Sequence, residues 1–200
     1  MLHLIGVNHR AQVRERGYED THCQRELARR LRRAVSDFKL SFVAEEYYEE
    51  LLVQRGEESI AKEIALEIGI EHRFCNPNNE ELCEIGCLDL NTIYWMLRRP
   101  NNGCLSLSEI KVQAQAILTA RYSPIRERFW FDRLGELRGR DGVFVCGDAH
   151  VESFARFLGA NQIATNVVAR GIGFVPGEGE ETRETMKYLS EHPELANWEA

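Results

Sequence analysis

The sequence lacks the cysteine patterns that mark disulfide scaffolds and structural zinc sites. Only six of its 200 residues are cysteines, and no two of them form a C-x-x-C pair. Cys83 and Cys87 lie four residues apart, with no second pair to complete a zinc site. A chain of this length can bury a core without disulfides or a structural metal, so we expect reduced, mostly buried thiols.

Long apolar runs are also missing. No stretch approaches the roughly 18 to 20 apolar residues that a membrane span needs. The opening residues, MLHLIG, show no basic region followed by a long apolar one, so no signal peptide is indicated. We therefore expect a soluble cytoplasmic protein with no membrane partner.

Positive charge is in deficit: 25 Lys and Arg stand against 32 Asp and Glu, for a net charge of −7. No basic stripe alternates with aromatic residues, so a nucleic-acid partner is not expected. Residues 1–40 nevertheless hold nine basic and five acidic residues, whereas residues 41–100 hold five and thirteen. Two interpretations stay open: a solvated helix face beside an acidic surface, or attraction of an anionic ligand.

Strand-like and helix-like patterns alternate along the chain. Short apolar runs predict strands over residues 2–7, 39–44, 70–75, 143–147 and 161–174. Apolar residues at helical spacing predict helices over residues 21–38, 45–56, 59–68, 151–159 and about 180–191, and an interrupted helical block over about 78–141. Such alternation implies crossover connections, hence an α/β fold with a mainly parallel or mixed sheet flanked by helices. We predict one domain over residues 1–176, with a helical insertion at about 78–141 and an acidic tail at 177–200.

Polar side chains follow several of the predicted strands. Ligands of parallel sheets bind beyond the carboxyl ends of the strands, so these residues form the candidate site. The candidates for catalysis are His9, Glu45, Glu46, Arg126 and His150. The candidates for substrate contact or support of the site are Asn8, Arg10, Asn76, Asp148 and Glu152.

The same short motif follows two of the strands. Gly6-Val-Asn-His9 and Gly147-Asp-Ala-His150 are both Gly-x-x-His turns. Glycine permits backbone angles and close approaches that a side chain would obstruct, and the histidine could then point over the sheet edge. A single short motif of this kind arises easily by chance, and each histidine could simply satisfy its own turn. Two such turns, each after a strand, indicate a shared site.

The two Gly-x-x-His motifs, the glutamate that ends the second strand and the arginine of Arg126-Glu127 resemble a superfamily. It joins erythromycin esterases, Tiki proteases, TraB pheromone-shutdown proteins and ChaN-type haem-binding proteins. The resemblance covers roughly residues 1–160 and implies a fold like that of erythromycin esterases and ChaN. It also implies a site of His9, Glu45 or Glu46, Arg126 and His150. The doubled glutamate leaves the functional carboxylate open, and the absence of secretion signals argues against surface proteolysis or haem delivery.

A hydrolase of a small-molecule ester, amide or phosphate is the leading functional hypothesis. A histidine can accept a proton from water at neutral pH, a glutamate can orient its ring, and Arg126 can hold an anionic group. Alternatively His9, Glu45 and His150 bind a divalent metal such as Zn or Mn. The rival hypothesis is a non-catalytic protein that binds a small molecule or haem, with Tyr47 or Tyr48 as an axial ligand.

Overall fold

The computed structural model describes residues 1–99, 105–174 and 180–197, so Cys104 lies outside the described residues. The chain divides into two compact units. The first comprises residues 1–78 and 127–174, and the second comprises residues 79–126 and 175–200. This division differs from the predicted single domain with a separate tail, because the C-terminal segment belongs to the same unit as the helices of the insertion.

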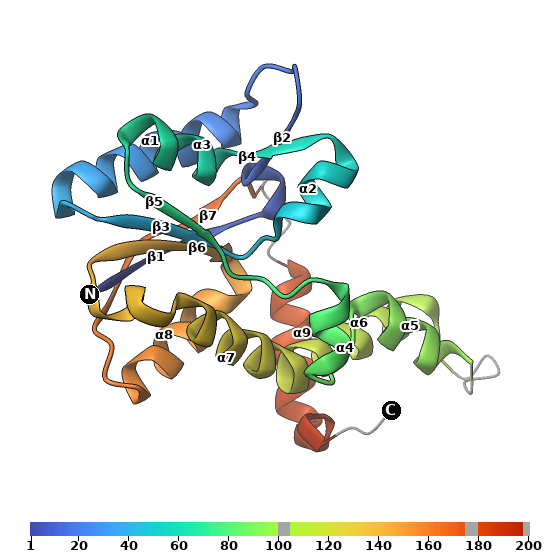
Figure 1. The fold of residues 1–200 in the computed structure, drawn as a ribbon. Helices are drawn as coiled ribbons and strands as arrows, with labels where there is room; N and C mark the ends of the chain where they lie inside the picture. Colours follow the sequence, from blue (N-terminus) through green and yellow to red (C-terminus); the bar gives the residue numbers. More distant parts are fainter. Residues whose placement is uncertain (100–104, 175–179, 198–200) are drawn as a thin grey trace. The chain divides into compact units, whose positions relative to one another are not determined.

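The first unit is built on a parallel sheet (Figure 1). Within the described residues, its five strands stand in the order β5-β3-β6-β1-β7, and every neighbouring pair is parallel. The strands are β1 Leu2–Val7, β3 Phe42–Glu45, β5 Glu71–Phe74, β6 Gly142–Gly147 and β7 Thr165–Ile172. The chain is therefore an α/β protein, as the alternating pattern predicts. A strand pair that the sequence pattern did not predict, β2 Val13–Glu15 with β4 Glu57–Ser59, is antiparallel.

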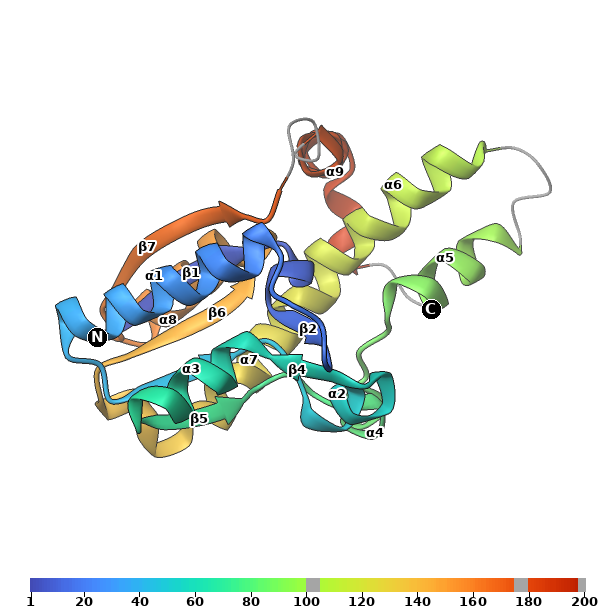
Figure 2. The same ribbon diagram turned by 90° about the horizontal axis from the view of Figure 1, so that it is seen from above.

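Helices cover both faces of the sheet (Figures 1 and 2). Alternate strand residues pack into the core on each face. One face carries α1 His22–Phe38 and α3 Ile60–Ile68, and α2 Glu49–Arg55 precedes β4. Leu27 and Leu31 of α1 pack there against Ile5 and Val145 of the sheet. The other face carries α8 Val151–Ala160 and the part of α7 Ser123–Leu134 that belongs to this unit. Burial on both faces explains why the strands read as apolar runs rather than as alternating patterns.

Local signals fix where the helices begin and end. Thr21 and Gln24 form a capping box at the start of α1, as their spacing predicts. Gly56 and Gly69 end α2 and α3 in the left-handed conformation, which glycine adopts without strain.

The second unit is helical. It contains α4 Asn79–Glu84, α5 Leu90–Arg98, α6 Leu107–Ile117, a π-helical turn Leu118–Tyr122 and α9 Glu180–Glu191. Its core joins Ile93 and Ile117 to Tyr188, Leu189 and Leu195. These apolar contacts tie the C-terminal helix to the insertion, because the helix buries its apolar face there. No helix among the described residues has the length and apolar character needed to cross a membrane.

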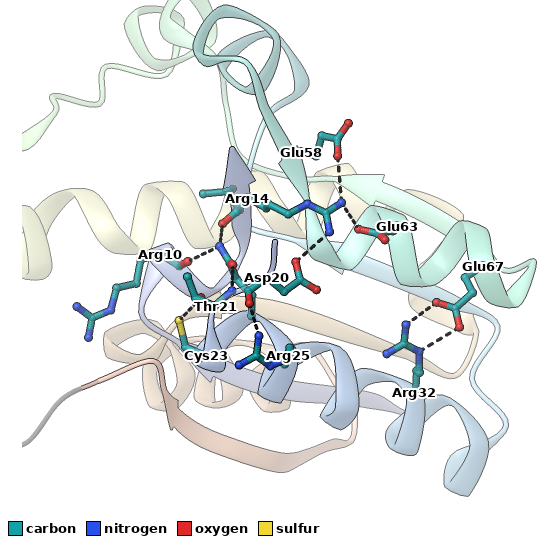
Figure 3. A network of polar contacts seen from close by, with 12 residues as sticks. Arg10, Arg14, Asp20, Thr21, Cys23, Arg25, Arg32, Glu58, Glu63 and Glu67 are labelled. Carbon is teal, nitrogen blue, oxygen red and sulfur yellow. Dashed lines mark hydrogen bonds and ion pairs between the residues drawn. The ribbon is translucent and has the colours of Figure 1, made fainter. Parts of the chain in front are cut away.

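Several basic residues of β2 and α1 are paired with acidic side chains (Figure 3). The Arg14 guanidinium lies 2.8 to 3.0 Å from the carboxylates of Asp20, Glu58 and Glu63. Arg32 and Glu67 form a second pair with two hydrogen bonds. The two charge-biased segments thus neutralise each other across neighbouring elements, which agrees with the interpretation of a solvated face.

The thiols of the described residues differ in burial, and this predicts their reactivity. Burial raises the pKa of Cys75 to about 12 and that of Cys87 to about 11, and it raises the pKa of Cys146 well above its usual value. Cys83 is exposed and Cys23 is partly exposed. At pH 8, Ellman's reagent should therefore react quickly with Cys23 and Cys83 and slowly with the three buried thiols, because the thiolate is the nucleophile. In denaturant all should react, and fast modification of Cys146 in the folded protein would contradict the structure.

The same raised pKa values predict a loss of stability at high pH. Above about pH 8.5 the thiols ionise in the unfolded chain but stay protonated in the folded one. The unfolded state then binds fewer protons, so the free energy of unfolding falls as the pH rises toward the folded pKa values. Urea titrations at pH 8 and pH 10 would measure the difference.

Candidate functional site

Three strand ends meet at one edge of the sheet. In the parallel register, Val7 at the end of β1 pairs with Gly147 at the end of β6, and Glu45 at the end of β3 pairs with Val145. The residues that follow these strands therefore lie side by side, although they are about 40 and 100 positions apart in sequence. They bring His9, Glu46 and His150 together.

The carboxylate of Glu46 is the centre of this group. It is buried, and its Oε2 accepts a hydrogen bond of 2.8 Å from the backbone N–H of Gly147. Its Oε1 lies 3.7 Å from Nε2 of His150 and 4.0 Å from Nε2 of His9. Each imidazole ring thus points its Nε2 atom at Oε1 of Glu46, at a distance just beyond that of a direct hydrogen bond.

The other nitrogen of each ring is held by a buried side chain. Nδ1 of His9 lies 2.7 Å from Oε1 of Gln12, and Nδ1 of His150 lies 2.9 Å from Oε1 of Glu127. Glu127 also accepts a hydrogen bond of 2.5 Å from the hydroxyl of Ser153. Such contacts fix the rotation of the rings and leave both Nε2 atoms facing Glu46.

The histidines differ in exposure. The His9 side chain is 54% exposed, whereas that of His150 is 12% exposed and packs edge-on against the Trp130 ring at 4.9 Å. His9 is therefore the most solvent-exposed of the three side chains.

Both glycines of the repeated motif lie where little space is available for a side chain. A Cβ on Gly6 would collide with the Asp148 carboxylate and with Cγ2 of Val151. A Cβ on Gly147 would lie 3.1 Å from Nε2 of His9 and 3.4 Å from Oε2 of Glu46. The motif therefore allows the two turns to approach one another, and Gly147 adjoins the histidine of the other turn.

Replacement of Gly147 by alanine tests this packing. The added methyl group should displace the His9 ring by a few tenths of an ångström while leaving the buried sheet nearly intact. We expect the free energy of unfolding to fall by about 1 kcal/mol, within the range of single methylene insertions. We also expect the His9 NMR signals to shift while those of His72 stay in place. Unchanged His9 signals would contradict the contact.

Glu45 is not part of the group around Glu46. Its carboxylate is fully buried, and Oε1 accepts hydrogen bonds from Ser59 Oγ at 2.5 Å and from His72 Nε2 at 2.8 Å. Adjacent residues of an extended chain point in opposite directions, so the two neighbouring glutamates serve different surroundings. The other oxygen of Glu45 has no hydrogen-bond partner among the described residues.

The predicted metal set of His9, Glu45 and His150 is therefore not assembled. Within residues 1–99, 105–174 and 180–197, no three or more His, Cys, Asp or Glu side chains form a group that could hold a metal ion. Of the two glutamates that the sequence leaves open, Glu46 is the one that faces both histidines.

Four other predicted residues shape the neighbouring turns instead of facing Glu46. Asn8 caps its own turn by accepting from the N–H of Arg10, and Arg10 donates to the carbonyl of Gly173 beyond β7. Asp148 and Glu152 both bind the guanidinium of Arg170 on β7. These contacts fasten the two Gly-x-x-His turns to the end of β7.

The remaining candidates lie further from the carboxylate or in the other unit. Asn76 accepts a hydrogen bond of 3.2 Å from the indole N–H of Trp130 and so supports His150 indirectly. Tyr47 is buried, and burial raises its pKa, while Tyr48 precedes α2 as its N-cap. Arg126 belongs to the second unit, so its role stays a prediction.

Sequence reasoning missed Gln12 and Glu127. Gln12 follows His9 by three positions, a spacing that brings side chains together in a helical turn. Glu127 adjoins the predicted Arg126, but nothing local connects it to His150.

The thiol of Cys146 is no candidate nucleophile. Burial raises its pKa, and the nearby carboxylates of Glu46 and Glu127 raise it further.

No protein-family model matches this chain, and the searches of curated proteins and of solved structures give no match either. The resemblance to the erythromycin esterase, Tiki, TraB and ChaN superfamily therefore stays a prediction, carried by the residues that suggested it.

Proposed function

We propose that this protein is a hydrolase whose site consists of His9, Glu46 and His150. The observation that carries the proposal is the convergence of two imidazole Nε2 atoms on one buried carboxylate oxygen. Distances of 3.7 and 4.0 Å are too long for direct hydrogen bonds and short enough for one water molecule to bridge the groups.

Hydrolysis needs a water molecule that loses a proton as it attacks. One histidine accepts this proton. General-base catalysis of this kind accelerates a reaction by about 10²- to 10⁴-fold. The negative charge of Glu46 stabilises the imidazolium that forms, because opposite charges interact strongly in a partly buried site. The second histidine polarises the bond that is cleaved.

The proposed substrate is a small molecule with an ester, amide or phosphate bond. Among the described residues, His9, Glu46 and His150 supply the groups for this mechanism. The exposed side of His9 provides the approach for the substrate.

A panel of chromogenic probes tests the proposal. Purified protein should hydrolyse at least one of p-nitrophenyl acetate, p-nitrophenyl phosphate and a peptide p-nitroanilide above the rate in buffer. Glu46→Gln keeps the volume and removes the charge, so kcat/KM for that probe should fall by about 10²-fold. Glu67→Gln, a charge-matched change in the surface pair with Arg32, should leave kcat/KM within twofold.

Two results would overturn the proposal. The first is a turnover that survives in Glu46→Gln. The second is an absence of turnover together with a Soret band on addition of haem, which would favour the binding alternative.

A further inference from the structure

We infer that the two site histidines have unequal roles, set by the residues that hold their Nδ1 atoms. Glu127 positions His150 as the base, while Gln12 lets His9 act as a hydrogen-bond donor. This inference rests on the proposed hydrolase function and assigns the roles that the function leaves open.

Glu127 leaves His150 a single arrangement. A carboxylate only accepts hydrogen bonds, and the Ser153 hydroxyl already donates to the same oxygen that contacts His150. Nδ1 of His150 must therefore carry hydrogen, and in the neutral ring the lone pair stands on Nε2. That lone pair faces the bridging position beside Glu46, and packing against Trp130 restrains the ring from turning away.

Gln12 leaves His9 two arrangements. Its side chain is buried, its Oε1 contacts Nδ1 of His9, and its Nε2 has no hydrogen-bond partner among the described residues. An amide presents an acceptor at one end and donors at the other, so a half-turn exchanges them. With the amide nitrogen toward Nδ1, the neutral His9 ring carries its hydrogen on Nε2 and donates it toward Glu46 or a substrate oxygen.

Together these constraints define the path of the proton during hydrolysis. His150 Nε2 takes one proton from water as the water oxygen bonds to the carbonyl carbon or phosphorus. The bond to the leaving group then breaks, and His150 returns the proton to that group. His9 keeps its proton and stabilises the developing oxyanion through Nε2–H. Glu127 and Gln12 touch neither water nor substrate, so both are positioning residues.

The hydrogen on each ring can be observed directly by long-range ¹H–¹⁵N correlation spectra of the histidine side chains above about pH 8. His150, assigned by loss of its signals in His150→Gln, should carry hydrogen on Nδ1 in the unaltered protein. Glu127→Ala should move it toward the Nε2–H form. Glu127→Gln retains an acceptor oxygen and should restore the Nδ1–H form at least in part. Ser153→Ala should leave it in place, because the contact of Glu127 with His150 remains.

Measurements of kcat/KM for the same variants provide a second test. Glu127→Ala should lower kcat/KM by about 10- to 100-fold, the usual loss when an orienting group of a histidine is removed. Glu127→Gln should recover part of this loss, whereas a purely structural role would give equal losses and unchanged spectra. Gln12→Ala should lower kcat/KM by less than about tenfold, since solvent can replace either end of the amide at the exposed His9.

The NMR spectra test the inference, and the hydrolysis of a probe tests the proposed function, so the two can fail independently. Hydrogen on Nε2 of His150 in the unaltered protein, or a spectrum unchanged in Glu127→Ala, would overturn the inference even if a probe is hydrolysed. The expected spectra without hydrolysis of any probe would uphold the positioning by Glu127 and overturn the hydrolase. If Glu127→Ala fails to fold, hydrogen on Nε2 of His150 in the unaltered protein would overturn the inference, and a partial shift toward the Nε2–H form in Glu127→Gln, with none in Ser153→Ala, would support it.

Discussion

Replacing both His9 and His150 with alanine should lower the hydrolysis of a cleaved probe to the level left by binding alone, a loss of about 10³- to 10⁴-fold in kcat/KM. The reason is that no imidazole would then face the oxygen of Glu46, which both rings approach within 4.0 Å. Initial rates with the probe that the unaltered protein hydrolyses best would measure this loss.

The single replacements determine whether the two rings act as one unit. Groups that share one reaction step are strongly non-additive, so each single alanine change should already cause most of the loss. His72→Gln is a matched control, because His72 contacts Glu45 rather than Glu46. If the doubly substituted protein keeps the rate of the unaltered one, the catalytic role of this site is wrong.

Replacing Trp130 with alanine should lower the free energy of unfolding by about 3–5 kcal/mol, the range for large aromatic side chains in a core. The indole is fully buried. Its ring centroid lies 5.5 Å from Phe144 on β6 and 5.4 Å from Phe154 on α8. The substitution would therefore open a cavity between the sheet and its helices, and urea unfolding followed by circular dichroism would measure the cost.

Trp130→Phe separates the packing of the ring from its hydrogen bond. Phenylalanine keeps the aromatic contacts but leaves Oδ1 of Asn76 without the indole N–H, so we expect a loss of only about 1–2 kcal/mol. Because Trp130 also restrains His150, Trp130→Ala should broaden the NMR signals of that ring. A cost below about 1 kcal/mol for Trp130→Ala would show that the core around it is not packed as described.

The sequence alone predicted the sheet and the edge of the sheet at which the candidate residues meet. Apolar runs such as residues 2–7 and 143–147 become strands β1 and β6, because strands covered on both faces need apolar residues throughout. Alternation with helices implied parallel strands. Parallel strands place their carboxyl ends at one edge, and this brings His9 near His150 across a long separation in sequence.

Tertiary structure alone decided which side chains surround the two histidines. Glu45 and Glu46 are chemically identical neighbours, and they differ only in which side of the strand end each faces. That choice depends on which helices cover each face of the sheet, an outcome of long-range packing that no local pattern encodes. The same holds for Glu127, whose contact with His150 requires α7 to pack against the sheet through Trp130. It also holds for α9, whose apolar side chains pack within the helical unit.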